Sequence, residues 1–172
     1  WRAAYGPEAA EAIAALIGEE PATDLTLRDP ADAQALLTAL NTAPVEEPSE
    51  ALDDTTAAAE AEISPKAVAL PGGSLRVTRR GDVAGWPGFD EGRWWVQDAA
   101  AAVPARLLGV KPGDLVLDLC AAPGGKTMQL AAAGAKVTAL DRSEGRLKRL
   151  IANLARTGLD AEIITAEAAA WR

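Results

Sequence analysis

Ten residues, Asp118 to Thr127, have the types and spacing to bind a polar ligand, and they read Asp-Leu-Cys-Ala-Ala-Pro-Gly-Gly-Lys-Thr. They follow the apolar run 115–117, which predicts a strand, and lead into a helix predicted at about 125–133. At such a junction in a parallel sheet, backbone N–H groups can meet a polar ligand. Gly124 and Gly125 would let that ligand approach the backbone closely, because neither residue carries a Cβ. The sequence therefore predicts a ligand slot in this turn.

Two acidic residues follow the next two predicted strands. Asp141 ends the strand predicted at 136–140, and Glu167 follows the strand predicted at 161–165. Because crossovers between parallel strands are right-handed, Asp141 should lie beside the first turn. A carboxylate there suits bidentate acceptance from two ribose hydroxyls, and Glu167 could accept a hydrogen bond from an adenine amine. The acidic pair favours a nucleoside-containing ligand.

Two common nucleotide-binding motifs do not fit the same turn. A P-loop needs a glycine five positions before its Gly-Lys-Thr, but that position holds Cys120. The dinucleotide fingerprint G-x-G-x-x-G is also absent, because the turn reads Ala-Pro-Gly-Gly-Lys-Thr from Ala122 onward. Both motifs are disfavoured.

The second half of the sequence alternates between helical and strand patterns. A helix capped by Asp98 ends near Gly109, and the segments that follow it predict the order β-α-β-α-β. These segments are 115–117, 125–133, 136–140, 144–157 and 161–165. This order is that of the opening half of a doubly wound parallel sheet.

The apolar run Leu115-Val116-Leu117 is typical of a strand buried in a parallel sheet. With three strands predicted, this strand lacks a neighbour on one side, which leaves an apolar edge. We expect a partner chain, or further residues of the protein, to cover that edge.

The first half of the sequence predicts a small α+β module. Helices are predicted from Pro7 to Gly18 and from the Asp29 cap to Leu40, with short strands at 25–27, 67–70, 75–78 and 94–96. Between them, residues from about 41 to 62 are rich in alanine and acidic side chains without sustained periodicity, and they predict a mobile acidic insert.

The net charge of −8 is unevenly distributed along the chain. Residues 1–62 hold 14 acidic and 2 basic side chains, whereas residues 63–172 hold 11 acidic and 15 basic ones. With no histidine and one cysteine, the chain offers no obvious zinc cluster, Ser-His triad or imidazole base. No apolar run approaches the roughly 18 to 20 residues that a membrane span needs, so a soluble, cytoplasmic protein is expected.

The ten-residue turn resembles motif I of the Sun/RsmB/Nop family of RNA cytosine-5 methyltransferases. The resemblance extends back through Gly92-Arg-Trp-Trp-Val-Gln-Asp-Ala-Ala and forward through Asp141 to Asn153-Leu154. It implies S-adenosyl-L-methionine as cofactor and RNA, of the small ribosomal subunit, as partner. The cofactor contacts that it implies are Cys120, Ala121, Ala122, Pro123, Gly124, Gly125 and Lys126 for the methionine portion, Asp141 for the ribose, and Glu167 where the family usually has aspartate.

The resemblance also implies a fold class and a domain division. Residues 1–97 would form an α+β RNA-recognition-like (RRM-like) module, and residues 98–172 the first half of an α/β, Rossmann-like class I methyltransferase domain. The family attacks cytosine with a cysteine in a Thr-Cys segment and uses a second cysteine in an Asp-Ala-Pro-Cys segment. Neither segment occurs here, so the chain is predicted to be a piece of a longer enzyme, truncated at both ends and inactive by itself. The alternatives are a fragment that only binds cofactor or RNA, and a methyltransferase for another substrate.

Several residues keep a structural interpretation beside the functional one. Cys120 is predicted to be a buried small apolar side chain. Asp118 either caps the turn or contacts the methionine amine, and Lys126 is either solvated or neutralises a carboxylate or phosphate. Arginines 76, 79, 80 and 93 interleave with tryptophans 86, 94 and 95, which would suit RNA binding, although one of the adjacent indoles should be core. The basic residues of 142–156 are predicted to form a solvated helix face.

Overall fold

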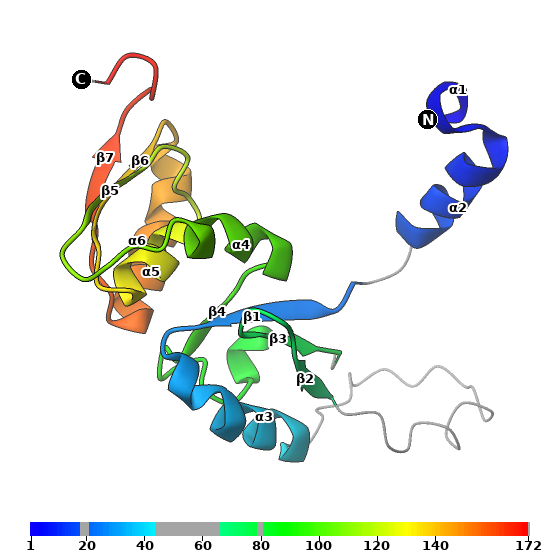
Figure 1. Ribbon diagram of the computed structural model, residues 1–172, viewed down its shortest axis with the longest axis horizontal. Helices are drawn as coiled ribbons and strands as arrows, with labels where there is room; N and C mark the ends of the chain where they lie inside the picture. Colours follow the sequence, from blue (N-terminus) through cyan, green and yellow to red (C-terminus); the bar gives the residue numbers. More distant parts are fainter. Residues whose placement is uncertain (18–20, 44–65, 79–80, 172) are drawn as a thin grey trace.

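The computed structural model describes residues 1–17, 21–43, 66–78 and 81–171. The chain begins with two helices, α1 (Arg2–Tyr5) and α2 (Pro7–Ile17), which project from the remainder (Figure 1). Within the described residues, no helix has both the length and the apolar content to span a membrane.

The first sheet has four antiparallel strands in the order β2-β3-β1-β4. Its strands are β1 (Thr23–Leu27), β2 (Ala67–Ala69), β3 (Ser74–Val77) and β4 (Trp94–Val96). Helix α3 (Ala33–Thr42) packs on one face, where Leu36 and Leu40 are fully buried. Asp29 caps a short 3-10 turn, η1 (Pro30–Asp32), and the α-helix begins only after it. A second 3-10 turn, η2 (Val83–Gly85), lies between β3 and β4.

The acidic insert predicted at about 41–62 lies outside the described residues from residue 44 onward. Its first two residues, Asn41 and Thr42, belong to α3.

The second sheet is parallel and has the order β5-β6-β7. Its elements are α4 (Ala99–Leu107), β5 (Leu115–Asp118), α5 (Gly125–Ala132), β6 (Lys136–Asp141), α6 (Glu144–Thr157) and β7 (Glu162–Thr165). The caps follow the sequence: Asp98 Oδ1 accepts from Ala101 N at 3.0 Å, and Gly158 ends α6 with φ 64°. A parallel sheet fits the predicted Rossmann-like class.

Strand β5 occupies an open edge of the sheet, as three predicted strands imply, and its leucines are not buried within this chain as the apolar run 115–117 suggested. Leu115 is 83% exposed and Leu117 is 42% exposed. Among the described residues, only β6 pairs with this strand, and side chains of an edge strand lose the cover that a second neighbour provides.

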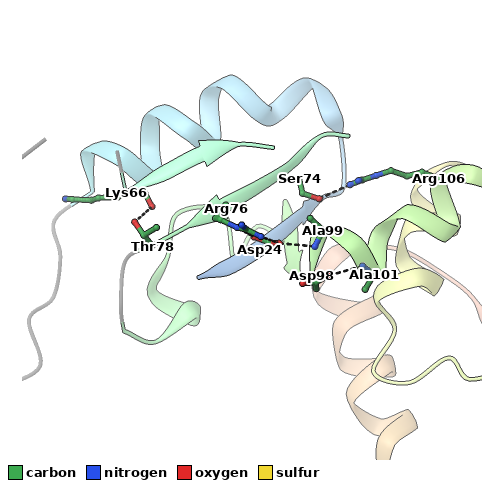
Figure 2. A network of polar contacts seen from close by, with 9 residues as sticks. All are labelled: Asp24, Lys66, Ser74, Arg76, Thr78, Asp98, Ala99, Ala101 and Arg106. Atoms are coloured by element: carbon green, nitrogen blue, oxygen red, sulfur yellow. Dashed lines mark hydrogen bonds and ion pairs between the residues drawn. The ribbon is translucent and has the colours of Figure 1, made fainter. Parts of the chain in front are cut away.

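The two faces of the first sheet meet different parts of the molecule. Leu25 and Leu27 of β1 point into the core with α3, whereas Asp24 and Thr26 point to the opposite face. There Ala99 N, at the start of α4, donates to Asp24 Oδ2 at 3.0 Å (Figure 2). The face turned away from α3 therefore forms the junction with the second sheet and its helices.

The adjacent tryptophans of β4 are buried in two different cores. Trp94 packs in the core of the first sheet, and Trp95 packs with Met128, Leu147 and Leu150 in the core of the second. Both indoles are at most 2% exposed. Sequence alternation predicts that they face opposite ways, and the structure shows that each face is covered.

Candidate functional site

The turn between β5 and α5 is closed by its own side chains. Thr127 Oγ1 donates to Asp118 Oδ2 at 2.7 Å, which ties the first turn of the helix to the end of the strand. The structure therefore supports the capping interpretation of Asp118. Thr127 is fully buried and Asp118 is half-buried, so this hydrogen bond is partly shielded from water.

Glycine is required at one position of the turn and favoured at the next. Gly124 has φ 112°, and a Cβ there would collide with Leu150 of α6. At Gly125, a Cβ would lie 3.1 Å from the side-chain carbonyl carbon of Gln97. These neighbours are part of the protein, so the glycines also let the turn sit tightly on α6 and Gln97.

Asp141 lies beside the turn, at the position that a right-handed crossover predicts. Its Oδ2 accepts from Ala122 N at 3.2 Å, and its Oδ1 accepts from Ser143 N at 2.9 Å. Arg146 Nη1 lies 3.1 Å from Oδ2. The residue is 3% exposed. Three donors therefore surround a buried carboxylate that offers about four acceptor positions.

Helix α6 holds the turn from the other side. Arg146 Nη2 donates to the backbone carbonyl of Ala122, and Asn153 Nδ2 donates to that of Pro123 at 3.1 Å. Sequence reasoning missed both roles and treated Arg146 as part of a solvated face. A signal existed, because residues seven apart lie on one face of a helix and both belong to the stretch that resembles the family.

The remaining predicted residues divide by exposure. Ala121 and Ala122 are buried, whereas Cys120, Pro123 and Lys126 are exposed. The prediction that Cys120 is buried is therefore wrong, because it directly follows the open edge strand. No carboxylate in the described ranges pairs with Lys126, which leaves its ammonium free to meet an anionic group.

Glu167 follows β7 and its side chain is exposed. Its backbone carbonyl accepts from Ala170 N and Trp171 N, each at 3.0 Å, and this turn fixes the residue after the strand. Because β7 pairs with β6 in parallel, Glu167 and Asp141 follow the carboxyl ends of neighbouring strands. Within the described residues, no cluster of three histidine, cysteine, aspartate or glutamate side chains could hold a metal ion.

The tryptophans do not form the RNA surface that their interleaving with arginines suggested. Trp86, Trp94 and Trp95 are all buried, at 5%, 0% and 2% exposure. Arg76 pairs with Asp24 at 2.7 Å and Arg93 with Asp32 at 2.9 Å, while residues 79 and 80 lie outside the described ranges. Spacing alone did not reveal that both faces of β4 are covered.

The second half of the chain matches a family model described as 16S rRNA methyltransferase RsmB/F, over residues 105–171. Residues 105–171 are therefore similar to the RsmB/F family. The match confirms the resemblance of the ten-residue turn.

Relatives named ribosomal RNA small subunit methyltransferase B show the same likeness. The one from Pseudomonas putida is 51% identical over 96 residues, covering 52% of this chain and 22% of the relative. The one from Vibrio vulnificus is 47% identical over 89 residues, covering 51% and 21%. The matched stretch thus spans about a fifth of each relative.

A solved structure shares the arrangement of both sheets. It is a methyltransferase homologue from Pyrococcus horikoshii, with a TM-score of 0.69 and 24% identity, covering 95% of this chain and 49% of that one. At this identity the likeness shows the fold alone, and it extends over the first sheet as well as the second.

Proposed function

We propose that this chain is the cofactor-binding part, with its adjoining α+β module, of an S-adenosyl-L-methionine-dependent methyltransferase that modifies C5 of a cytosine in ribosomal RNA. The observation that carries the proposal is the turn from Asp118 to Thr127 with the Asp141 carboxylate beside it, within a segment that matches RsmB/F enzymes. As the sequence predicts, these 172 residues bind the cofactor but do not catalyse methyl transfer by themselves.

The residues of the site fit the chemistry of that cofactor, which would supply the methyl group. The exposed Lys126 ammonium can neutralise the methionine carboxylate, and the backbone of Cys120 to Gly125 would hold the methionine portion. Asp141 would accept from the ribose, and the exposed Glu167 carboxylate would accept from the adenine amine.

The surroundings of Asp141 limit how the ribose can bind. With Ala122 N, Ser143 N and Arg146 already donating, the carboxylate has about one acceptor position left. One hydroxyl can bind directly. Bidentate acceptance requires Arg146 Nη1 to move away from Oδ2.

We also propose that residues 1–97 form an RRM-like module and residues 98–172 the methyltransferase half-domain. The order β-η-α-β-β-η-β and the four-stranded antiparallel sheet support this proposal. An RRM stacks bases on aromatic side chains of its open sheet face. Here the face turned away from α3 meets α4 and contributes Trp95 to the second core, so RNA bases would not stack on Trp95 of this face.

Calorimetry of the full chain with S-adenosyl-L-homocysteine tests cofactor binding. Asp141→Asn should weaken binding by about tenfold or more, because the amide loses one acceptor and the negative charge. Asp160→Asn, an exposed carboxylate on the loop before β7, is the matched control and should leave affinity unchanged. Thermal unfolding without ligand separates loss of affinity from loss of fold. Absence of binding to the parent chain would refute the proposal.

Methyl transfer to unmodified small-subunit ribosomal RNA tests the rest. We expect no transfer by the 172 residues, since the one cysteine, Cys120, follows β5 within the turn and not a Thr-Cys segment. Transfer restored by adding the remaining part of a relative's catalytic domain would support the cytosine assignment. Turnover by this chain alone would contradict it.

A further inference from the structure

A cavity of about 270 Å³ lies at the junction between the first sheet and the helices of the second. Four of the residues that line it have side-chain hydrogen-bond donors, namely Thr26 of β1, Arg28 just after β1, Arg106 of α4 and Gln129 of α5. Gln129 Nε2 already donates to the backbone carbonyl of Ala102. The turn of Gly72 and Gly73 and the C-terminal ends of α4 and α5 complete its wall. None of the lining residues is acidic.

Thr26 carries the clearest sign that this cavity binds something. Its Oγ1 is the one buried side-chain polar atom in the described part of the chain without a hydrogen-bond partner, and the residue is 4% exposed. Leaving a buried hydroxyl unsatisfied costs about 1–3 kcal/mol, so such groups usually have a partner. Thr26 is among the residues that line this cavity, so we ask whether a ligand bound there satisfies the hydroxyl.

The two arginines bring positive charge to the lining of the cavity, and the charge of Arg28 also acts on the nearby Asp32 carboxylate. Arg28 Nη1 donates to the backbone carbonyl of Thr157 at 3.0 Å, and Arg106 Nη2 donates to Ser74 Oγ at 2.9 Å (Figure 2). Across the described ranges, neither guanidinium forms an ion pair with a carboxylate. A guanidinium has five N–H donors, so each keeps donors available for an anion.

The first sheet positions Arg106 at the cavity. Ser74 lies directly opposite Thr26 in the β1–β3 register, so the two hydroxyls share a face. Gly72 has φ 88°, and a Cβ there would lie 2.9 Å from Arg106 Nη1. Glycine at this position therefore leaves room for the guanidinium.

We propose that this cavity binds a phosphate group, supplied by the backbone of the RNA substrate, and this choice of source rests on the proposed function. Two guanidiniums and a hydroxyl are all donors, and guanidinium geometry matches phosphate oxygens. A cavity of about 270 Å³ also leaves space for the ribose that flanks a phosphate.

The phosphate site is separate from the cofactor slot. Gln129, Ala132 and Ala133 line the cavity near the end of α5, whereas the cofactor turn precedes its first residue, Gly125. Eight helical residues rise about 12 Å, so the two ligands bind at opposite ends of one helix and at the same time.

Titration of the full chain with inorganic phosphate, followed by NMR at fixed ionic strength with chloride as the reference anion, tests the site. We expect saturable shifts at the amides of Thr26, Gly72 and Gly73. Arg106→Gln should weaken phosphate binding by about tenfold, and Thr26→Val by about three- to tenfold, because each removes a donor. Arg149→Gln, which removes an exposed guanidinium on α6, is the control for charge alone and should bind like the parent.

Thr26→Val keeps the test independent of folding. Valine has the shape of threonine without the unsatisfied hydroxyl, so the variant should unfold no more easily than the parent. Weaker phosphate binding by a chain of equal or greater stability supports the proposal. Equal phosphate binding by parent, Thr26→Val and Arg106→Gln overturns it, as does the absence of saturable shifts.

Binding of unmodified small-subunit ribosomal RNA identifies the source of the phosphate. Arg106→Gln should reduce the slope of log K against log salt by about one charge's contribution, and Arg149→Gln should not. If Arg106→Gln loses inorganic phosphate but binds RNA with unchanged affinity and slope, the ligand is free phosphate and the RNA assignment is overturned. Calorimetry with S-adenosyl-L-homocysteine is independent of this result, so failure of the proposed cofactor site and failure of this cavity are distinguishable.

Discussion

Strand β1 buries two polar residues, whereas strand β5 exposes two leucines. Asp24 and Thr26 are 5% and 4% exposed, and Leu115 and Leu117 are 83% and 42% exposed. The difference follows from what lies next to each strand, since β1 is a central strand with α4 on its polar face and β5 is an edge strand. Burial in this molecule is therefore decided by neighbours more than by the apolar content of a strand.

Trp95→Ala should give the largest loss of stability, because this side chain of the first sheet is buried in the core of the second sheet. We expect a loss of about 3–5 kcal/mol in the free energy of unfolding, from lost burial and the cavity left behind. Urea unfolding measures it. The next residue, Val96, is 52% exposed, and Val96→Ala is the control, expected to change stability by about 0.5 kcal/mol or less. Similar losses for the two variants would mean that the junction is not packed as described.

Arg156→Gln tests the polar part of the same junction. Arg156 Nη1 donates to the carbonyl of Phe89 at 2.6 Å and Nη2 to that of Trp94 at 3.1 Å, and the guanidinium carbon lies 4.0 Å from the centroid of the Phe89 ring. Burial lowers the pKa of this guanidinium without neutralising it. Losing these contacts should cost about 3 kcal/mol in chemical unfolding. Arg149→Gln, on the exposed side of α6, should lie within about 0.5 kcal/mol of the parent.

Asp24→Asn tests the buried polar face of β1. Arg76 donates to Asp24 at 2.7 and 2.9 Å, and this hydrogen bonding lowers the pKa of the carboxyl. The variant should lose about 2 kcal/mol near pH 7, measured by urea unfolding.

The pH dependence of that loss has a fixed sign. A lowered carboxyl pKa stabilises the fold above the ordinary value of about 4, and the contribution disappears as the pH falls through the lowered pKa. The difference between parent and Asp24→Asn should therefore shrink below about pH 4. Asp160→Asn is the exposed control, and a difference that does not shrink as the pH falls below about 4 would contradict this account.

Leu115→Lys should have the smallest effect, because its side chain is exposed already. We expect a change within about 0.5 kcal/mol in unfolding of the isolated chain, together with less self-association in sedimentation. A loss above about 1 kcal/mol that grows with protein concentration would show that a second copy covers the edge of β5. In that case the contrast with β1 would hold only for the monomer.

Local sequence patterns predicted the order of the elements because they depend on short-range physics. The caps at Asp98 and Gly158 and the helix from Glu144 to Thr157 follow from side-chain hydrogen bonding and positive φ. The position of Asp141 beside the turn follows from the handedness of a crossover.

What the sequence did not predict depends on contacts between distant segments. Period-two alternation shows that Trp94 and Trp95 face opposite ways, but it does not show what covers each face. The same limit applies to Arg146 and Asn153. A polar helix face is expected whether it is solvated or binds the turn, so the pattern does not distinguish the two. Cys120 directly follows the edge strand β5 and is exposed, whereas the residue type alone favoured burial.

The adjacency of Trp94 and Trp95 constrains how this chain can be recombined or engineered. A crossover point for domain shuffling is tolerated where few contacts are cut, yet within β4 a single peptide bond separates residues of two cores. If the chain were cut within β4 and either sheet were joined to a foreign partner, the core of the second sheet would lose Trp95. Trp95 would then be exposed on the first sheet. We therefore expect the two sheets to be exchanged between proteins together, as one unit.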